Sequence, residues 1–323
     1  MLDGYGREAD YLRISVTDKC NLRCRYCMPV DIETVPMSEI LTFEEVTDTV
    51  SVAASLGIKK VRITGGEPLI RRNVNGLIKM LKAVDGIEQV TLTTNGVLLP
   101  EYIGKLKEAG IDGINISLDT LDREKYKELT GSDELDRVLG GIKTALKTDI
   151  PIKLNAVSLD LEDAFSLVEF VKDKALDLRF IELMPIGYGR DHRGIPHSIL
   201  ITSVMDRYDG AESDDTGTGN GPAVYYRIPG YKGRIGFISA LSRPFCDNCN
   251  RIRLTTKGYL KSCLCYDTGV DLKGILRSGL PEDARKEKLR YGIKEAILCK
   301  PKSHCFISED NISEKDPMSR IGG

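Results

Sequence analysis

Six short runs in the first 184 residues alternate apolar and polar positions, and helix-like stretches lie between most of them. One helix is predicted to begin after Thr42, where Thr42 and Glu45 form a capping box, and to stop at Gly57. A regular strand–helix–strand order at this spacing is typical of parallel βα units. The six runs are residues 12–17, 61–66, 90–95, 114–119, 152–157 and 178–183.

The number of these units limits the fold. Six are too few for a closed eight-stranded barrel, so we expect an α/β fold, an incomplete (βα)6 barrel. A doubly wound open sheet is the alternative. We expect the barrel over residues 4–210, a flexible, glycine-rich connection over 211–223, and a C-terminal region over 224–323 that closes the open side.

The alternation also predicts what the barrel contains. In the first five runs one face is apolar and the other polar, and a strand places each set on one side. If the apolar face meets the helices, the polar face lines a lumen that a ligand and water must fill. An exposed antiparallel sheet is the alternative. The sixth run shows no such split. The polar positions are Arg13, Ser15, Arg62, Thr64, Thr91, Thr93, Asn95, Asn115, Ser117, Asp119, Lys153 and Asn155.

Composition narrows the class of protein. A net charge of −2 over 323 residues argues against a nucleic-acid binder, which would be basic. The nine cysteines are odd in number and partly clustered, which suits metal ligation in a reducing compartment better than a disulfide framework. The start of the chain shows no secretory leader and no run of about 18 apolar residues occurs, so we expect a cytoplasmic protein without a membrane span.

The first cysteine group is Cys20, Cys24 and Cys27, spaced C-x3-C-x2-C. Three thiolates at this spacing can bind three irons of a cubic iron–sulfur cluster and leave the fourth iron open to a small molecule. Half of a zinc site is the alternative interpretation.

The second cysteine group is Cys246, Cys249 and Cys263, spaced C-x2-C-x13-C. It could likewise hold a cluster with one open iron, or become a zinc ribbon if Cys265 supplies a fourth thiolate. Arg251 and Arg253 would face the same side of a strand, as binding of a polyanion requires, although a solvated strand face would look the same.

The first cysteine group resembles the signature of the radical S-adenosylmethionine (SAM) superfamily, and Tyr26 fits the aromatic position usual there. In that superfamily the open iron holds SAM, and its reductive cleavage yields a 5′-deoxyadenosyl radical. The run Gly65-Gly66-Glu67-Pro68, directly after the second strand, resembles the element that holds the methionine moiety. The resemblance implies that SAM contacts Tyr26, Gly66, Ser117 and Met184.

Three further features accompany the first cysteine motif: C-x2-C-x-R-x-R-L at Cys246–Leu254, a further cysteine, and the ending Arg320-Ile321-Gly322-Gly323. With these features the sequence is similar to the GTP 3′,8-cyclase (molybdenum cofactor biosynthesis protein A) family. That resemblance implies two [4Fe–4S] clusters and SAM as cofactors. It implies abstraction of the 3′ hydrogen of GTP and attack of C3′ on guanine C8, giving (8S)-3′,8-cyclo-7,8-dihydroguanosine 5′-triphosphate. The GTP-binding residues would be Arg13, Arg62, Thr93, Lys153, Arg251 and Arg253.

The same resemblance implies further features. Gly322 and Gly323 would enter the active site and organise SAM and GTP. A reductant such as flavodoxin or ferredoxin would supply electrons, cyclic pyranopterin monophosphate synthase would act downstream, and a homodimer is compatible with the family. Cys265, Cys299 and Cys305 have no assigned role. The competing interpretations are another radical SAM enzyme, acting on a peptide, and an electron carrier with two clusters. Neither requires the pair Arg251 and Arg253.

Overall fold

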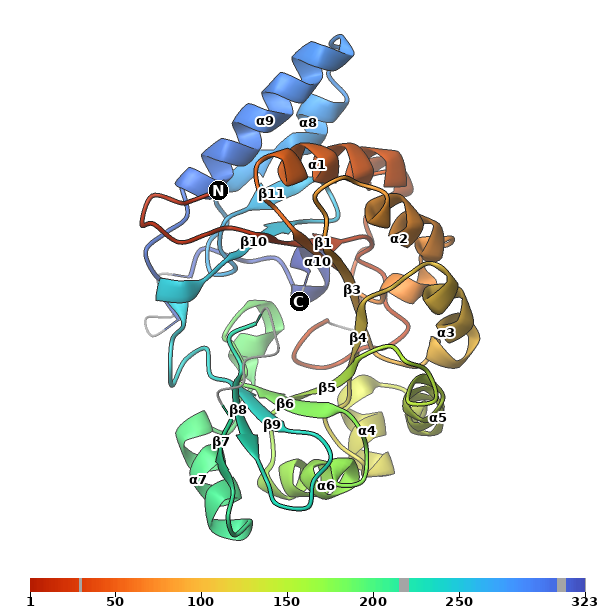
Figure 1. Ribbon diagram of the computed structural model, residues 1–323, viewed down its shortest axis with the longest axis vertical. Helices are drawn as coiled ribbons and strands as arrows, with labels where there is room; N and C mark the ends of the chain where they lie inside the picture. The colour runs from red at the N-terminus through yellow and green to blue at the C-terminus, as the bar shows by residue number, and fades with distance from the viewer. Residues whose placement is uncertain (29–30, 215–220, 307–311, 323) are drawn as a thin grey trace.

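The computed structural model describes residues 1–28, 31–214, 221–306 and 312–322 (Figure 1). Its strands form one twelve-stranded sheet in the order β12-β11-β10-β1-β2-β3-β4-β5-β6-β9-β8-β7. The strands are β1 (Tyr11–Ser15), β2 (Lys60–Thr64), β3 (Gln89–Thr94), β4 (Gly113–Ser117), β5 (Ile152–Val157), β6 (Asp177–Ile181), β7 (Glu212–Ser213), β8 (Val224–Arg227), β9 (Ile235–Ile238), β10 (Arg251–Leu254), β11 (Tyr259–Lys261) and β12 (Gly269–Asp271).

Strands β1 to β6 are parallel and follow one another in chain order. A doubly wound sheet would reverse this order at a switch point, so the incomplete βα barrel is confirmed. The outer helices are α1 (Phe43–Ser55), α2 (Val74–Lys82), α3 (Leu99–Glu108), α4 (Arg123–Thr130), α5 (Leu135–Ala145), α6 (Leu161–Val171) and α7 (His197–Arg207). The predicted capping box is present at α1, where Thr42 and Glu45 satisfy each other's backbone N–H groups.

The core lies between the sheet and these helices. On β1 and β2 the side chains of Leu12, Ile14, Val61 and Ile63 are fully buried. These are the apolar positions of the alternating runs, so the apolar face meets the helices as predicted. The alternate positions point the other way, into the barrel.

The C-terminal region extends this sheet at both edges. Strand β9 pairs in parallel with β6, and β10 pairs in parallel with β1. The chain between them, residues 239–250, therefore crosses from one edge of the six-stranded barrel to the other. This crossing segment contains Cys246 and Cys249. Within the predicted connection 211–223, β7 pairs with β8, and residues 215–220 lie outside the described residues.

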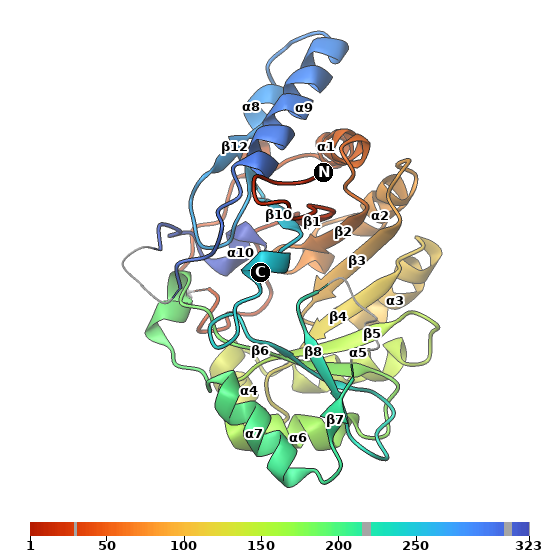
Figure 2. The same cartoon turned by 60° about the vertical axis from the view of Figure 1, so that its left-hand side comes forward.

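In the described part of the C-terminal region, three more α-helices follow the barrel. Helices α8 (Leu272–Leu276) and α9 (Glu282–Leu298) extend away from the barrel in both views (Figures 1 and 2). Helix α9 packs on α1, α8, β11 and β12. The short helix α10 (Met318–Ile321) returns to β1, near the centre of Figure 1. In the described ranges, no helix has the length and apolar character needed to span a membrane.

Candidate active site

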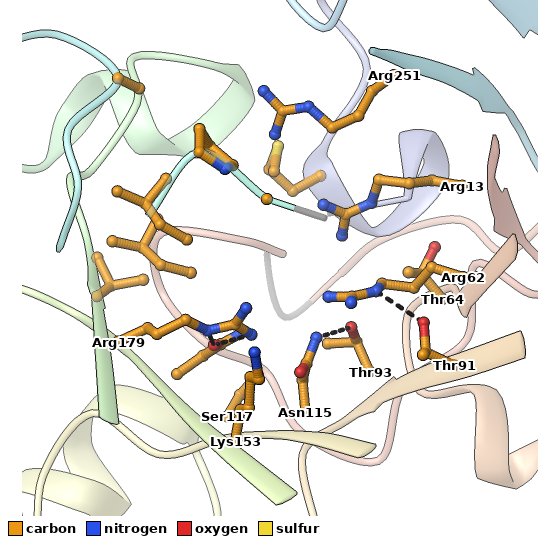
Figure 3. A pocket seen from close by; sticks show the side chains of 18 of the residues that line it. Arg13, Arg62, Thr64, Thr91, Thr93, Asn115, Ser117, Lys153, Arg179 and Arg251 are labelled. Carbon is orange, nitrogen blue, oxygen red and sulfur yellow. Dashed lines mark hydrogen bonds between the residues drawn. The ribbon is translucent and has the colours of Figure 1, made fainter. Parts of the chain in front are cut away.

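A cavity of about 850 Å³ occupies the interior of the barrel. Side chains from β1 to β6 and from β10 line it, several of which Figure 3 labels. Both cysteine groups are also part of the lining. The cavity also contains the positions that sequence reasoning assigned to SAM and GTP: Tyr26, Gly66, Ser117, Met184, Arg13, Arg62, Thr93, Lys153, Arg251 and Arg253. The fold therefore brings together groups that are far apart in the sequence, such as Cys20 and Cys263, which lie 243 positions apart.

The two cysteine groups lie at opposite ends of the strands. The first group follows the carboxyl end of β1, as active-site residues of βα barrels do. Cys249 comes just before β10, whose Arg251 is in register with Tyr11 at the amino end of β1. A five-residue strand, about 16 Å long, separates the two ends. A substrate between them can contact both groups.

The polar strand positions line the cavity, as the alternation predicted, with two exceptions. Ser15 and Asp119 are not part of the lining. The Ser15 hydroxyl lies 2.7 Å from that of Thr256. Asp119 accepts a 2.6 Å hydrogen bond from the Tyr26 hydroxyl and a 2.8 Å bond from the Val157 N–H, and burial raises its pKa to about 6.

Cationic side chains gather on one wall of the cavity. Arg253, Arg13 and Arg62 occupy the same register position on the neighbouring strands β10, β1 and β2. Burial and the charges of Arg253, Arg62 and Arg251 lower the pKa of Arg13 well below its usual value. Figure 3 shows the guanidinium groups of Arg13, Arg62 and Arg251 directed toward the same space. Such crowding favours binding of a polyanion.

Lys153 lies on the opposite wall, on β5. Burial, and then the positive charge of Arg179, lower the pKa of Lys153 to about 8. The Lys153 ammonium lies 3.4 Å from the Tyr225 hydroxyl. Because an anion nearby would favour its charged form, Lys153 is suited to contact the same ligand as the arginines.

Sequence reasoning missed Arg179. This residue lines the cavity, and its Nε and Nη2 donate hydrogen bonds of 2.9 and 2.7 Å to Asn155 Oδ1. The sixth run shows no apolar–polar split because its cavity-facing positions are one polar residue, Arg179, and one apolar residue, Ile181, while Leu178 and Phe180 on the other face are fully buried. The apolar Ile181 hid the cavity-facing side of β6 in the sequence. Arg179, which is in register with Asn155, was the one polar residue that could have revealed that side.

The first cysteine group lies in a desolvated part of the cavity. Burial raises the pKa of Cys27 to about 12, and the charge of Cys20 adds to the effect. Burial also raises the pKa of Cys24 well above its usual value, and the charges of Cys27, Asp119 and Cys20 raise it further. The three thiols are therefore close enough to interact electrostatically. Bound iron would hold them as thiolates, since the thiolate is the metal ligand.

The Gly-Gly-Glu-Pro turn is fixed against the loop that carries these cysteines. A Cβ atom at Gly66 would lie 2.2 Å from the carbonyl oxygen of Lys19, so only glycine fits. Glu67 is fully buried and accepts hydrogen bonds from the Thr94 hydroxyl and from the N–H groups of Asn95 and Leu69. Burial nevertheless raises the Glu67 pKa to about 7.

The second cysteine group lies among cations. Burial alone would raise the pKa of Cys249, but the charges of Arg251 and Lys300 outweigh it and lower the value to about 6. Cys246 Sγ accepts a 3.3 Å hydrogen bond from the His304 N–H. In the part of the chain that the structure describes, no three His, Cys, Asp or Glu side chains are close enough to share a single metal ion.

Cys265 has a different environment from Cys263. Cys263 lines the cavity, whereas Cys265 is fully buried in a small apolar cluster that includes Leu264 and Phe306. The Cys305 N–H donates a 3.2 Å hydrogen bond to Cys265 Sγ, and burial and the Cys305 side chain raise the Cys265 pKa. Cys299 is exposed. Cys265 is therefore packed within this cluster and is not part of the cavity lining.

The C-terminal segment contacts the first cysteine group and the cationic wall. The backbone N–H of Ser319 lies close enough to Cys27, in the first cysteine group, to oppose the rise in the pKa of its thiol. The carbonyl oxygen of Gly322 accepts a hydrogen bond from Arg253. Gly322 has φ +78°, and a Cβ atom there would lie 2.8 Å from the Thr64 hydroxyl oxygen. Gly323 lies outside the described residues.

Comparisons with known proteins agree with this arrangement. Residues 14–173 match the family model of the Radical SAM superfamily, and residues 176–306 match Molybdenum Cofactor Synthesis C. A crystal structure of Streptococcus suis SuiB bound to S-adenosylmethionine is similar in fold, with a TM-score of 0.62 at 16% identity. The match covers 96% of this chain and 76% of SuiB.

Relatives with higher identity extend over the full length. The chain is 43% identical over 327 residues to a GTP 3′,8-cyclase of Clostridium perfringens, with 100% of each chain covered. It is 41% identical over 335 residues to a GTP 3′,8-cyclase of Alkaliphilus oremlandii, again with 100% of each covered. The chain therefore belongs to the GTP 3′,8-cyclase family of radical SAM proteins.

Proposed function

We propose that this protein is a GTP 3′,8-cyclase that forms the C3′–C8 bond of the first intermediate in molybdenum cofactor biosynthesis. The observation that carries the proposal is one cavity with a three-cysteine group at each end of its strands and a cationic wall between them. A carrier of closed clusters would need neither the cavity nor the cations. The full-length identity to curated cyclases supports the same conclusion.

The cysteine groups fit two [4Fe–4S] clusters with one open iron each. Cys20, Cys24 and Cys27 would hold the first cluster, and Cys246, Cys249 and Cys263 the second. When bound, the first cluster and SAM supply a 5′-deoxyadenosyl radical that removes the 3′ hydrogen of GTP. Tyr26, Gly66, Ser117 and Met184 line the cavity where SAM would contact them.

The cationic residues would bind the triphosphate and orient the ribose. Arg253, Arg13 and Arg62 present their guanidinium groups from one register row, and Arg251 lies next to the second cysteine group. Lys153 and Thr93, from β5 and β3, would complete the site. Anchoring the triphosphate on this wall fixes C3′ and C8 relative to each other, so proximity lowers the barrier to ring closure.

The C-terminal residues would align the two halves of this site. Ser319 contacts Cys27 and Gly322 contacts Arg253, so one short segment links the first cysteine group to the phosphate-binding wall. We propose that Gly322 and Gly323 thereby organise SAM and GTP for hydrogen abstraction. The absence of a side chain at Gly322 supports this role, because a Cβ atom would clash with Thr64.

Several finer expectations belong to the same proposal. A flavodoxin or ferredoxin would supply the electron, and a cyclic pyranopterin monophosphate synthase would consume the product. A homodimer is compatible with the family. We place the enzyme in the cytoplasm, since free clustered cysteines suit a reducing compartment.

The direct test is anaerobic reconstitution followed by incubation with SAM, a reductant and GTP deuterated at C3′. We expect the deuterium to appear in 5′-deoxyadenosine and the nucleotide product to keep its triphosphate, as mass spectrometry would show. Cys24→Ala should reduce the iron content to about half, because one of two cubes is lost, and should form no 5′-deoxyadenosine. SAM cleavage by Cys24→Ala, or deuterium retained in the product, would contradict the proposal.

Cys263 and Cys265 form a matched pair for testing the second cluster. Cys263→Ser should lower the iron content and abolish cyclisation, because Cys263 lines the cavity. Cys265→Ser should keep the wild-type iron content, because its side chain faces Cys305 instead. Iron analysis and electron paramagnetic resonance (EPR) after anaerobic preparation measure the second cluster in each of the two variants. Equal iron losses would show that Cys265 is also a ligand, and copurifying zinc would favour a zinc ribbon.

Arg62→Ala and Arg251→Ala should each weaken GTP binding more than guanosine binding. A hydrogen bond to a charged group contributes about 1.5–3 kcal/mol, so the GTP dissociation constant should rise about ten- to a hundred-fold. Arg72→Ala, on the exposed surface, is the control and should leave both affinities unchanged. Calorimetry with both ligands measures the difference. Equal losses for GTP and guanosine would argue against a triphosphate role.

Gly322→Ala tests the C-terminal segment. The added methyl group would meet Thr64 and displace the carbonyl bonded to Arg253, so cyclisation should fall while the iron content stays unchanged. Gly279→Ala is the matched control: its φ is also positive, +69°, but nothing lies within 4 Å of the added atom. If both variants lost the same activity, backbone strain rather than the active-site contact would be responsible.

A further inference from the structure

Lys300 is a buried lysine directly beside the second cysteine group. It follows helix α9, and only 3% of the residue is exposed. Its ammonium lies 3.6 Å from Cys249 Sγ, 2.8 Å from the carbonyl oxygen of Arg251 and 3.2 Å from that of Ser262. A lysine ammonium has three donors, and these three acceptors use all of them.

The position of Lys300 differs from that of the other cations near this group. Arg251 and Arg253 line the cavity, where a substrate can reach them, whereas Lys300 is not part of the lining. It therefore approaches Cys249 from the side away from the cavity. Its charge is available to the thiolate and is not shared with a ligand in the cavity.

Lys300 also joins the two segments that carry the ligands. Cys249 lies two residues before Arg251, the first residue of β10. Ser262 directly follows β11 and directly precedes Cys263. A single ammonium bonded to both backbone carbonyls fixes the distance between these segments. Arg7 extends the arrangement, because its Nη1 donates to the carbonyl oxygens of Cys246 and Lys302.

The first cysteine group has different hydrogen-bond donors. Cys20 Sγ accepts from the Leu22 N–H at 3.4 Å and lies 3.7 Å from the Asn95 amide nitrogen, and the backbone N–H of Ser319 lies near Cys27. These donors are neutral. The nearby cation Arg23 donates to the carbonyl oxygens of Cys20 and Leu22 rather than to a cysteine sulfur. A charged donor to a ligand sulfur therefore distinguishes the second group.

We propose that Lys300 is a positioning residue for the second cluster: it compensates the charge of the Cys249 thiolate and raises the reduction potential of the cluster. Reduction adds negative charge to a cluster, and a cation hydrogen-bonded to a ligating sulfur stabilises the reduced form more than the oxidised form. Outer-shell partners of this kind tune metal sites without touching the substrate. The inference rests on the proposed function, because it requires a cluster at the second group.

The experiment is an anaerobic redox titration followed by EPR, on the reconstituted enzyme and on the same variants in a Cys24→Ala background, where only the second cluster reports. The variants are Lys300→Met, which removes charge and donors, Lys300→Gln, which keeps an uncharged donor, and Lys300→Arg, which keeps the charge. Lys302→Met, two residues away and exposed, is the matched control.

At the potential where the wild-type second cluster is half reduced, Lys300→Met should lower its reduced-to-oxidised ratio at least tenfold, a shift of about 59 mV for one electron. Lys300→Gln should lower it less, and Lys300→Arg and Lys302→Met should leave it unchanged. The first cluster should titrate as in the wild type in every variant.

Equal second-cluster ratios in the wild type, Lys300→Gln and Lys300→Arg would overturn the inference, even if stability falls. If Lys300→Met does not retain iron, the reduced-to-oxidised ratios of the second cluster in Lys300→Gln and Lys300→Arg are compared instead. Equal ratios in these two variants would overturn the inference. Absence of a second cluster from the wild type would instead refute the proposed function, so the two failures are distinguishable.

Discussion

Positive charge enclosed within the barrel is the constraint on which the rest of this structure depends. Strand alternation turns Arg13, Arg62 and Arg253 inward, and burial of cations is costly unless an anion accompanies them. The lowered pKa of Arg13 reflects that cost. A bound polyanion would offset that cost, so the strand pattern that builds the core also gathers the cations of this wall.

The incomplete barrel makes room for a second cysteine group. A closed eight-stranded barrel fills its interior with side chains, whereas six strands leave one side open. The segment over residues 239–250 crosses that opening because β9 joins β6 and β10 joins β1. Cys246 and Cys249 therefore reach the interior without belonging to the six-stranded barrel. The open side admits a second cluster and a large substrate together.

Local patterns in the sequence predicted the strands, the first helix cap and the inward polar face, because each depends on neighbours a few residues apart. Contacts between distant segments were not predictable in this way. Arg179 was missed because the apolar Ile181 shares its face of β6. The orientation of Cys265 depends on Cys305, 40 residues later, and the contact of Lys300 with Cys249 spans 51 residues. Lys300 and Cys305 both follow the long helix α9, and no local sequence pattern specifies where that helix packs.

The C-terminal segment shows how such distant contacts can become functional. Arg253 is in register with Arg13, so it belongs to the cationic wall, and it also bonds the Gly322 carbonyl. Ser319, three residues earlier, reaches Cys27. A change at the first cysteine group can therefore alter the position of Arg253, on the neighbouring strand β10, through four residues of backbone. The barrel holds the two cysteine groups apart, and this short segment couples the first of them to the cationic wall.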